Sequence, residues 1–222
     1  MPTSRPLRRI RSFVRRGRVT AAQARALRQL LPEYTYHPGH FPQQSGQRLY
    51  LEIGFGNGDS LAAMAAENPD ACFIGIEVHQ AGVGRLLLNL AQRQLHNVRL
   101  LNTDAIEVLQ QGRLELLFDG IYLLFPDPWP KKKHHKRRIL TREFAAQVSS
   151  HLKPGGYFCI ATDWQEYADA IVTTLENVPA LQPVNNPQSL PAFIPRPATK
   201  YELRGRRLKH KVIDLVYRRA TA

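Results

Sequence analysis

Residues 49–66 constrain the fold more than any other part of the chain, because they join a buried strand to a helix through closely spaced glycines. Residues 49–53 are mostly apolar, as expected of a strand buried on both faces of a sheet. Residues 60–66 are rich in alanine and favour a helix. The glycines between them are Gly54, Gly56 and Gly58. Glycine takes positive φ angles and lets a ligand approach the backbone, so we expect an α/β protein with a nucleotide-like group over this strand end.

The spacing of the glycines distinguishes two kinds of nucleotide site. A dinucleotide fingerprint, G-x-G-x-x-G, requires glycine or alanine at position 59, where this chain has Asp59. A carboxylate at a helix start repels a pyrophosphate, which argues against an NAD-dependent dehydrogenase. The pattern Glu52-x-Gly54-x-Gly56-x-Gly58 instead resembles the first motif of Rossmann-like methyltransferases that use S-adenosylmethionine, a cofactor without phosphates. The alternative is a tight strand-to-helix turn that binds no ligand.

Hydrophobic periodicity predicts the remaining elements. Further strands are expected at residues 71–78, 98–102, 120–125, 157–162 and 212–217. Helices are expected at residues 21–31, 83–95, 141–152 and 164–176, and a long loop at 179–197. The first helix should end at Pro32, and the third at Pro154-Gly155-Gly156. The methyltransferase resemblance implies a Rossmann-like methyltransferase fold, an α/β architecture. Its mostly parallel seven-stranded sheet would have helices on both faces and an antiparallel last strand.

Positive charge is concentrated in three segments, and the rest of the chain is net acidic. The formal net charge is +13, and the basic clusters lie in residues 5–18, 131–138 and 200–219. Such clusters outside an acidic body indicate a protein that binds a polyanion, for which nucleic acid is the best candidate. A solvated face is the alternative for any single cluster. Residues 1–20 are expected to form a flexible basic arm, followed by a single domain over residues 21–222.

Composition argues against several classes of protein. Cys72 and Cys159 lie in apolar runs, so we expect reduced core residues rather than a disulfide or a metal site. No apolar run approaches the roughly 20 residues that a membrane helix needs, so no membrane partner is expected. The basic arm lacks the apolar core of a secretory signal, but its many arginines and lack of acids would also suit an organelle transit peptide.

Acidic residues accompany the ends of three predicted strands. Glu52 and Glu77 lie near the ends of the first two, and Asp104, followed by Ala105, comes after the third. Glu77 stands about 20 residues beyond Gly58, where an acid binds the ribose hydroxyls in such folds. Asp104 can accept a hydrogen bond from the amine of an adenine. The alternatives are a solvated strand end for Glu77 and a helix N-cap for Asp104, but three acids at successive strand ends favour adenosine binding.

A rigid acidic turn follows the predicted strand at 120–125. In Pro126-Asp127-Pro128-Trp129-Pro130 the flanking prolines fix the direction of the Asp127 carboxylate. The carboxyl end of a strand is where an open α/β sheet places its chemistry, and the strand at 157–162 should bring Asp163 to the same edge. Trp129 is a candidate for stacking on a base, with a core tryptophan as the alternative.

Four motifs together resemble one family, the bacterial tRNA (guanine-N7-)-methyltransferases. They are Gly75-Ile76-Glu77-Val78-His79, Phe125-Pro126-Asp127-Pro128-Trp129-Pro130-Lys131-Lys132, Ala161-Thr162-Asp163-Trp164 and Thr199-Lys200-Tyr201-Glu202. The resemblance extends from about Arg11 to Tyr217. It implies a cytoplasmic enzyme that transfers a methyl group from S-adenosylmethionine to N7 of a guanine in the variable loop of tRNA.

The resemblance and the glycine turn also assign residues to roles. The cofactor would be bound by Glu52, Gly54, Gly56, Glu77, Asp104, Ala105 and Asp127, of which Asp127 would also be the active-site acid. The substrate guanosine would be bound by Lys131, Asp163, Thr199, Lys200, Tyr201 and Glu202. The RNA would be bound by Lys132, Lys133, His134, His135, Lys136, Arg137, Arg138 and Arg204.

The chemistry of the reaction bears on the role of Asp127. N7 of guanine carries a free lone pair, so methyl transfer from a sulfonium needs no base, and positioning should dominate. We hypothesise that Asp127 orients the guanine, or faces its developing positive charge, in a partly desolvated pocket. Asp163 and Glu202 are expected to accept hydrogen bonds from N1 and N2 of guanine, which would reject adenine.

Two rival functions remain open. The turn around Asp127 loosely resembles the Asp-Pro-Pro-Trp motif of enzymes that methylate exocyclic amines of adenine or cytosine, although here the acid has a proline on each side. A non-catalytic RNA-binding protein of the same fold is the other rival, and the presence of all the expected acids argues against it. The sequence does not distinguish a monomer from a homodimer.

Overall fold

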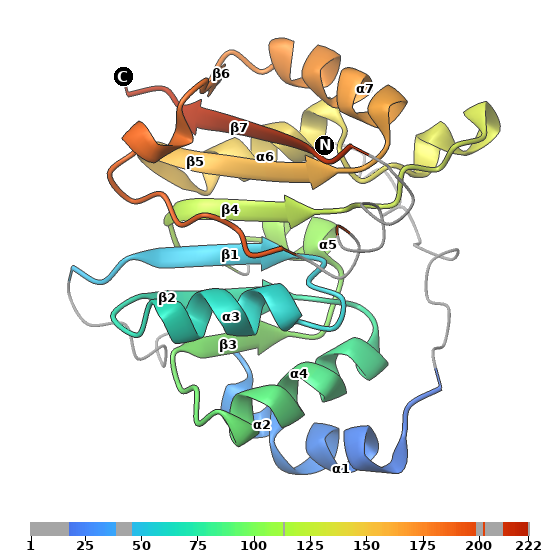
Figure 1. Cartoon of the computed structure of the whole chain (residues 1–222), viewed down its shortest axis with the longest axis vertical. Coiled ribbons are helices and arrows are strands. Elements are labelled where there is room, and N and C mark those ends of the chain that lie inside the picture. The colour runs from blue at the N-terminus through green and yellow to red at the C-terminus, as the bar shows by residue number, and fades with distance from the viewer. Residues whose placement is uncertain (1–17, 39–45, 113, 199–201, 203–210, 222) are drawn as a thin grey trace, which may run out of the picture.

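The computed structural model describes residues 18–38, 46–112, 114–198, 202 and 211–221. The strands within these residues form one seven-stranded sheet (Figure 1). The strands are β1 (Leu49–Ile53), β2 (Cys72–Ile76), β3 (Val98–Leu101), β4 (Phe118–Leu124), β5 (Leu152–Thr162), β6 (Leu181–Pro183) and β7 (Ile213–Arg219). Their order is β3-β2-β1-β4-β5-β7-β6. Neighbours from β3 to β5 are parallel, whereas β7 runs antiparallel to both β5 and β6. The predicted Rossmann-like architecture, with its antiparallel last strand, is therefore confirmed.

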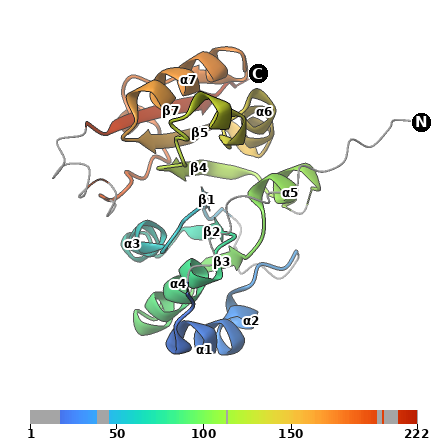
Figure 2. The same cartoon turned by 90° about the vertical axis from the view of Figure 1, so that its right-hand side faces the viewer.

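Helices cover both faces of the sheet (Figure 2). They are α1 (Ala21–Gln29), α2 (Leu31–Tyr34), α3 (Asp59–Glu67), α4 (Gln80–Gln92), α5 (Ala105–Gln110), α6 (Arg142–Ser150) and α7 (Gln165–Glu176), with short 3₁₀ helices η1 (Lys132–Arg137) and η2 (Pro187–Ser189). One hydrophobic cluster packs β1–β5 against α5, α6 and α7. A second cluster packs the opposite face against α1, α3 and α4. Alternate residues of β1–β5 and β7 belong to the two clusters, which explains the continuous apolar runs in the sequence.

The N-terminal helical region differs from the prediction at Pro32. α1 ends at Gln29 rather than at Leu31, and Pro32 lies in the first turn of the short helix α2. Proline is tolerated there because an N–H in the first turn of a helix has no partner within the helix. The Thr20 side chain accepts a hydrogen bond from Gln23 N and so caps the start of α1.

Strand β5 begins earlier than predicted. α6 ends at Ser150, and β5 starts at Leu152, so Pro154 and Gly155 belong to the strand instead of stopping the helix. The pairing of β4 with β5 shifts between Phe118 and Gly120, which accommodates these residues as an irregularity at the start of the strand. The expected long loop at 179–197 also contains β6 and η2, which were not predicted from the sequence.

Residues 190–198, which we call the strap, cross the face of the sheet that α3 and α4 also cover (Figure 1). Leu190 and Ile194 are buried there. Tyrosine hydroxyls from three strands bond the strap backbone. Tyr50 Oη donates to Ala192 O at 2.8 Å, Tyr122 Oη donates to Ile194 O at 2.7 Å, and Tyr157 Oη accepts from Ile194 N at 3.0 Å. The strap is therefore fixed to β1, β4 and β5.

Other expectations concern single residues and segments. Cys72 and Cys159 are buried free thiols, as predicted. Within the described ranges, no helix is long and apolar enough to cross a membrane. The same part of the chain contains no group of three His, Cys, Asp or Glu side chains that could hold a metal ion. Most of the predicted basic arm, residues 1–17, lies outside the described residues, so the division into arm and domain stays a prediction.

Candidate active site

A cavity of about 450 Å³ lies at the carboxyl edge of the sheet, where β1, β2, β3 and β4 end. Its wall includes every residue that was expected to bind the cofactor, namely Glu52, Gly54, Gly56, Glu77, Asp104, Ala105 and Asp127. Trp129, Lys136 and Arg137 line the same cavity. The structure thus brings the predicted cofactor residues together beside part of the predicted RNA-binding segment. A volume of this size suits a small-molecule ligand.

The glycine turn after β1 adopts the backbone that the sequence predicted. Gly54, Gly56 and Gly58 have φ angles of 70°, 59° and 74°, which side chains resist. A Cβ at Gly58 would lie 2.7 Å from the Leu86 side chain of α4. Gly82 of α4, which the sequence analysis did not single out, packs even closer, since a Cβ there would lie 2.0 Å from Gly56 O. α4 therefore supports the turn from behind, and only glycine at position 82 permits the contact.

Glu52 is a buried carboxyl group aimed at the cavity. The residue is 3 % exposed, and its Oε2 has no hydrogen-bond partner among the described residues. Burial, with a smaller contribution from the charge of Glu77, raises the pKa of Glu52 to about 8. A buried acid without a partner is costly, so this carboxyl group is suited to a ligand that brings a positive charge or a hydrogen-bond donor.

Glu77 holds the glycine turn to the end of β2. Its Oε2 accepts from Gly56 N at 2.8 Å, and its Oε1 accepts from Val78 N at 2.7 Å and His79 N at 2.9 Å. The residue is 5 % exposed, so the alternative of a solvated strand end is wrong. The carboxylate fixes the backbone around the cavity, and its predicted contact with a ribose stays a prediction.

Asp104 is the N-cap of α5. Its Oδ1 accepts from Ile106 N at 2.9 Å, so the alternative role as a helix cap is confirmed. Burial raises the pKa of Asp104, and the Ile106 hydrogen bond partly opposes this shift. Asp104 also lines the cavity, which leaves the predicted contact with an adenine amine compatible with its capping role.

The turn that carries Asp127 has a strained backbone. Phe125 and Trp129 have positive φ angles of 52° and 46°, which are rare for bulky residues and cluster at functional sites. Hydrogen bonds from Phe125 N to Ala161 O at 2.8 Å and from Arg138 Nε to Pro128 O at 2.8 Å help to hold the turn. Asp127 is exposed rather than partly desolvated, so any desolvation of its carboxylate must come from a bound substrate.

Arg138 has a different environment from the other cations of its segment. The residue is 7 % exposed, its guanidinium hydrogen-bonds both carboxylate oxygens of Glu166, and it stacks 4.6 Å from the Tyr167 ring centre. The hydrogen bonds from Arg138 lower the pKa of the Glu166 carboxyl group. Arg138 therefore offers little surface to RNA and instead joins the Asp127 turn to α7. His135, also expected to bind RNA, lies 3.9 Å from the same carboxylate.

The remaining predicted RNA-binding residues of this segment include two that contact Trp129, which lines the cavity. Lys132, Lys133 and Lys136 are exposed, as is Lys131, which was expected to bind the substrate guanosine. The Arg137 guanidinium lies 5.0 Å from the Trp129 ring centre, and the His134 ring meets it edge-on at 5.7 Å. Trp129 belongs to neither hydrophobic cluster, so the alternative of a core tryptophan is wrong.

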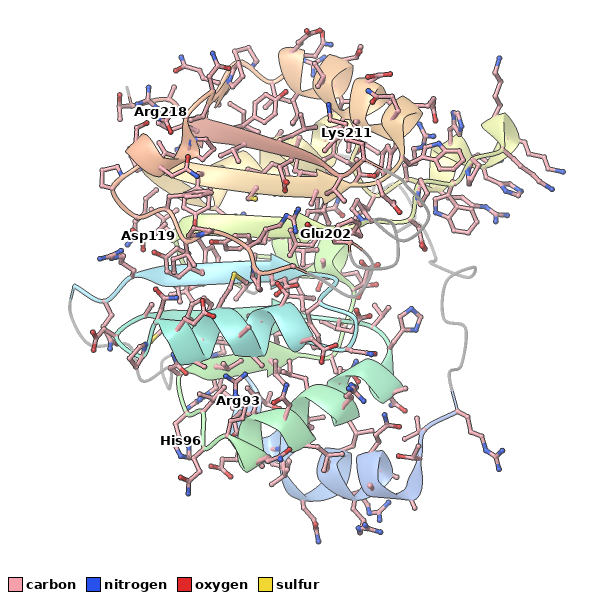
Figure 3. The ribbon with its side chains drawn as sticks, viewed as in Figure 1. Arg93, His96, Asp119, Glu202, Lys211 and Arg218 are labelled. Carbon is pink, nitrogen blue, oxygen red and sulfur yellow. The ribbon has the colours of Figure 1, made fainter. Side chains whose placement is uncertain are left out.

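The predicted substrate residues are only partly described. Asp163 is half-buried directly after β5, at the same edge as Asp127. Glu202 is 5 % exposed and pairs with Arg196, a residue that the sequence analysis did not assign a role. Figure 3 shows Glu202 beside the carboxyl ends of β1 and β4. Thr199, Lys200, Tyr201 and Arg204 lie outside the described residues.

Comparison with known proteins gives two kinds of similarity. A family model described as "Putative methyltransferase" matches residues 46–215. The chain is 45 % identical over 221 residues to a tRNA (guanine-N(7)-)-methyltransferase of Alkalilimnicola ehrlichii, covering 96 % of this chain and 93 % of that protein. It is 46 % identical to the protein of the same name from Methylobacillus flagellatus, covering 96 % and 92 %.

Solved structures with little sequence identity share the fold. The 16S rRNA methyltransferase KamB matches with a TM-score of 0.56 at 15 % identity, covering 92 % of this chain and 95 % of that one. An rRNA methylase from Streptococcus thermophilus matches with a TM-score of 0.51 at 12 % identity, covering 79 % and 88 %. At this level of identity the similarity shows the architecture alone.

Proposed function

Because the chain belongs to the family of tRNA (guanine-N(7)-)-methyltransferases, we propose that it transfers a methyl group from S-adenosylmethionine to N7 of a guanine in tRNA. The main support is the 45 % identity to a relative of that name over 96 % of this chain. The acidic cavity at the carboxyl edge of the sheet and the cations at its mouth agree with this activity. The variable-loop position of the guanine and a cytoplasmic location belong to the same proposal.

The residues around the cavity suit S-adenosylmethionine. The buried Oε2 of Glu52, which has no partner in the part of the chain that the structure describes, would complement the positive charge that this cofactor carries. The glycine turn leaves room for a nucleoside, while Asp59 at the start of α3 disfavours a pyrophosphate. Glu52, Glu77 and Asp104 would hold the cofactor, with Gly54, Gly56 and Ala105 in contact with it. When bound, the cofactor supplies an electrophilic methyl group on a sulfonium.

Asp127 acts on the guanine without removing a proton. N7 already carries a lone pair, so alignment is the main requirement, and the alignment of two bound reactants is worth roughly 7–11 kcal/mol. The product base is cationic, and the Asp127 carboxylate at the cavity wall would face that developing charge or orient the ring. The prolines at positions 126 and 128 limit the movement of Asp127 and so reduce the cost of this alignment.

Selection of guanine over adenine follows from hydrogen-bond polarity. Ionised carboxylates only accept hydrogen bonds, and guanine presents two donors, N1–H and the N2 amine, on one edge. Asp163 at the end of β5 and Glu202 beside β4 would accept these donors. Adenine carries no hydrogen at N1, so its ring nitrogen would face a carboxylate oxygen and be repelled.

The tRNA would lie over η1 and its flanking residues. Four exposed lysines of this segment carry positive charge next to the cavity, and Trp129 can stack on a base there. They are Lys131, Lys132, Lys133 and Lys136. Arg204 of the C-terminal basic cluster would add a further contact with phosphate.

Incubation with labelled S-adenosylmethionine and an unmodified tRNA transcript, followed by mapping of the modified nucleotide, tests the proposed function. The expected product is N7-methylguanine, which reduction and aniline convert into a strand break at the modified position. Label in N6-methyladenine or in a methylated cytosine would instead favour methylation of an exocyclic amine. Tight tRNA binding without any incorporation would favour a non-catalytic RNA-binding protein.

A further inference from the structure

Arg196 joins two acidic residues at the carboxyl edge of the sheet. Its Nε and Nη2 donate to Oδ1 and Oδ2 of Asp214 at 2.5 and 2.9 Å, in a bidentate arrangement. Its Nη1 donates to Glu202 Oε2 at 2.5 Å. The Arg196 side chain is 9 % exposed and the Glu202 side chain 7 % exposed, whereas that of Asp214 is 50 % exposed. A buried guanidinium with ordered partners has a fixed orientation, and it transmits that orientation to the carboxylate it holds.

The backbone around Arg196 is fixed by the strap. The tyrosine hydroxyls of β1, β4 and β5 bond the strap at Ala192 and Ile194, only two to four residues before Arg196. A Cβ at Gly120 would lie 2.4 Å from the Tyr157 ring, so the glycine of β4 makes room for this anchor. The position of Arg196 therefore depends on the sheet itself and not on a free loop.

Arg196 also contacts the turn that carries Asp127. Its guanidinium lies 5.6 Å from the ring centre of Phe125, which lines the cavity and has a positive φ angle. Phe125 N bonds Ala161 O, and Ala161 is paired with Asp214 across β5 and β7. One guanidinium thus contacts Phe125 before Asp127, Asp214 of β7 and Glu202.

We propose that Arg196 is a positioning residue for guanine recognition, which holds the Glu202 carboxylate at the correct distance from the Asp127 turn. The proposal rests on the proposed function, because it assumes that Glu202 accepts hydrogen bonds from the substrate base. Arg196 does not itself touch the reacting atoms. It carries one positive charge between two carboxylates, so the group keeps a net charge of −1 and stays attractive to the donor edge of guanine.

Single-turnover methylation of tRNA by the full-length chain tests this proposal through a double-mutant cycle. Arg196→Met should lower the methyl-transfer rate about 100-fold, as expected when a substrate group is misplaced by about 1 Å. Its affinity for S-adenosylmethionine should stay at the wild-type value. Glu202→Gln should also lower the rate, and the double variant should be no slower than Glu202→Gln alone, because Arg196 acts through Glu202.

Two further variants separate positioning from simple stability. Arg196→Lys keeps the charge but cannot make the bidentate pair, so it should give an intermediate rate at a melting temperature close to the wild-type value. Arg99→Met removes another partly buried arginine, whose Nη1 donates to Val98 O at 2.7 Å in β3, away from the cavity wall, and it should leave the rate unchanged. If Arg196→Met does not fold, Arg196→Lys replaces it in the double-mutant cycle with Glu202→Gln.

The outcomes are distinct for the two proposals. A wild-type rate in the folded Arg196 variants, losses that add to that of Glu202→Gln, or a parallel loss of cofactor affinity would overturn the positioning role while the wild-type chain still makes N7-methylguanine. A wild-type chain that methylates no guanine would overturn the proposed function and the positioning role together.

Discussion

At the scale of single residues, the buried Glu52 is placed for a ligand rather than for stability. Glu52 has a pKa of about 8 because burial penalises its charged form, and no described residue bonds its Oε2. A group whose folded-state pKa is raised contributes stability that is present below its unfolded value and is lost as the pH rises through the folded value. The folded chain therefore becomes less stable between about pH 4.5 and pH 8 on account of Glu52.

Glu52→Gln should stabilise the unliganded protein, and more so at high pH. The amide cannot ionise, so at pH 7 the variant should avoid a cost on the order of 3 kcal/mol, whereas near pH 4.5 the two proteins should be equally stable. Thermal unfolding at several pH values measures this difference. The same variant should bind S-adenosylmethionine more weakly. A stability difference that does not change between pH 5 and pH 8 would show that Glu52 does not titrate as described.

Asp127→Asn should slow methyl transfer by about 100-fold, because the developing charge of the base would lose its carboxylate. The loss should be the same from pH 6.5 to pH 9, since no proton has to be removed from N7. Single-turnover rates across this range, with cofactor affinity measured in parallel, check the prediction. A loss that vanishes at high pH would mean that hydroxide replaces Asp127 as a base, which the electrostatic role does not allow.

At the scale of elements, the cavity depends on contacts between helices and turns that are distant in sequence. α4 supplies the clearest case, because its two glycines face different neighbours. A Cβ at Gly82 would lie 2.0 Å from Gly56 O in the glycine turn, whereas a Cβ at Gly84 would lie 2.8 Å from the Gln23 side chain in α1. The same helix therefore offers a test residue and a matched control.

Gly82→Ala and Gly84→Ala should both destabilise the protein by about 1–3 kcal/mol through overpacking. Only Gly82→Ala should weaken the binding of S-adenosylmethionine, by about tenfold or more, because only this variant displaces the glycine turn. Equilibrium denaturation and calorimetric titration measure the two effects separately. Equal losses of cofactor affinity in both variants would mean that the loss comes from reduced global stability and not from displacement of the glycine turn.

Strands with a long apolar pattern could be predicted from the sequence. Strand segments that depend on pairing with a neighbouring strand could not. The bounds of the strands that contribute to both clusters were predicted to within two residues, except for the start of β5. β6 was missed because Leu181 is its only buried residue, so its pairing with β7 leaves no periodic pattern. A proline usually ends a helix. Here Pro154 instead lies within β5, where the pairing with β4 is irregular.

The candidate site was predictable where a motif carries it. Strand ends in a parallel sheet share one edge, which is why Glu52, Glu77 and Asp127 could be expected around one cavity. Gly82 and Arg196 could not be found this way, because their contacts with Gly56 and Asp214 depend on the tertiary fold. The burial of Arg138 could not be predicted either, because this residue follows a run of exposed cations in the sequence.

At the scale of the whole molecule, an acidic body presents positive charge in separate segments, of which η1 lies beside the cavity. This arrangement predicts that tRNA affinity falls steeply with salt. The logarithm of the binding constant should fall with the logarithm of salt concentration by about 0.7 for each phosphate neutralised on single-stranded RNA. An affinity that stays constant between low and physiological salt would show that the basic segments do not bind the phosphates of tRNA.

Lys132→Ala combined with Lys133→Ala should reduce the steepness of that salt dependence by about 1.4, since two exposed cations of η1 are lost. Filter binding of tRNA at several salt concentrations measures the slope. Lys153→Ala is the matched control. Lys153 pairs with Asp119, which Figure 3 shows at the opposite end of the sheet, so its loss should leave the slope unchanged.

The central claim is that the guanine N7 lone pair attacks the cofactor methyl group above the carboxyl edge of the sheet, with the protein supplying alignment and charge. The most direct measurement uses tRNA transcribed with 7-deazaguanosine triphosphate, in which a C–H group replaces N7. This RNA should compete with the normal transcript for binding but should accept no methyl group. Methyl incorporation into it at the rate of the normal transcript would contradict the account.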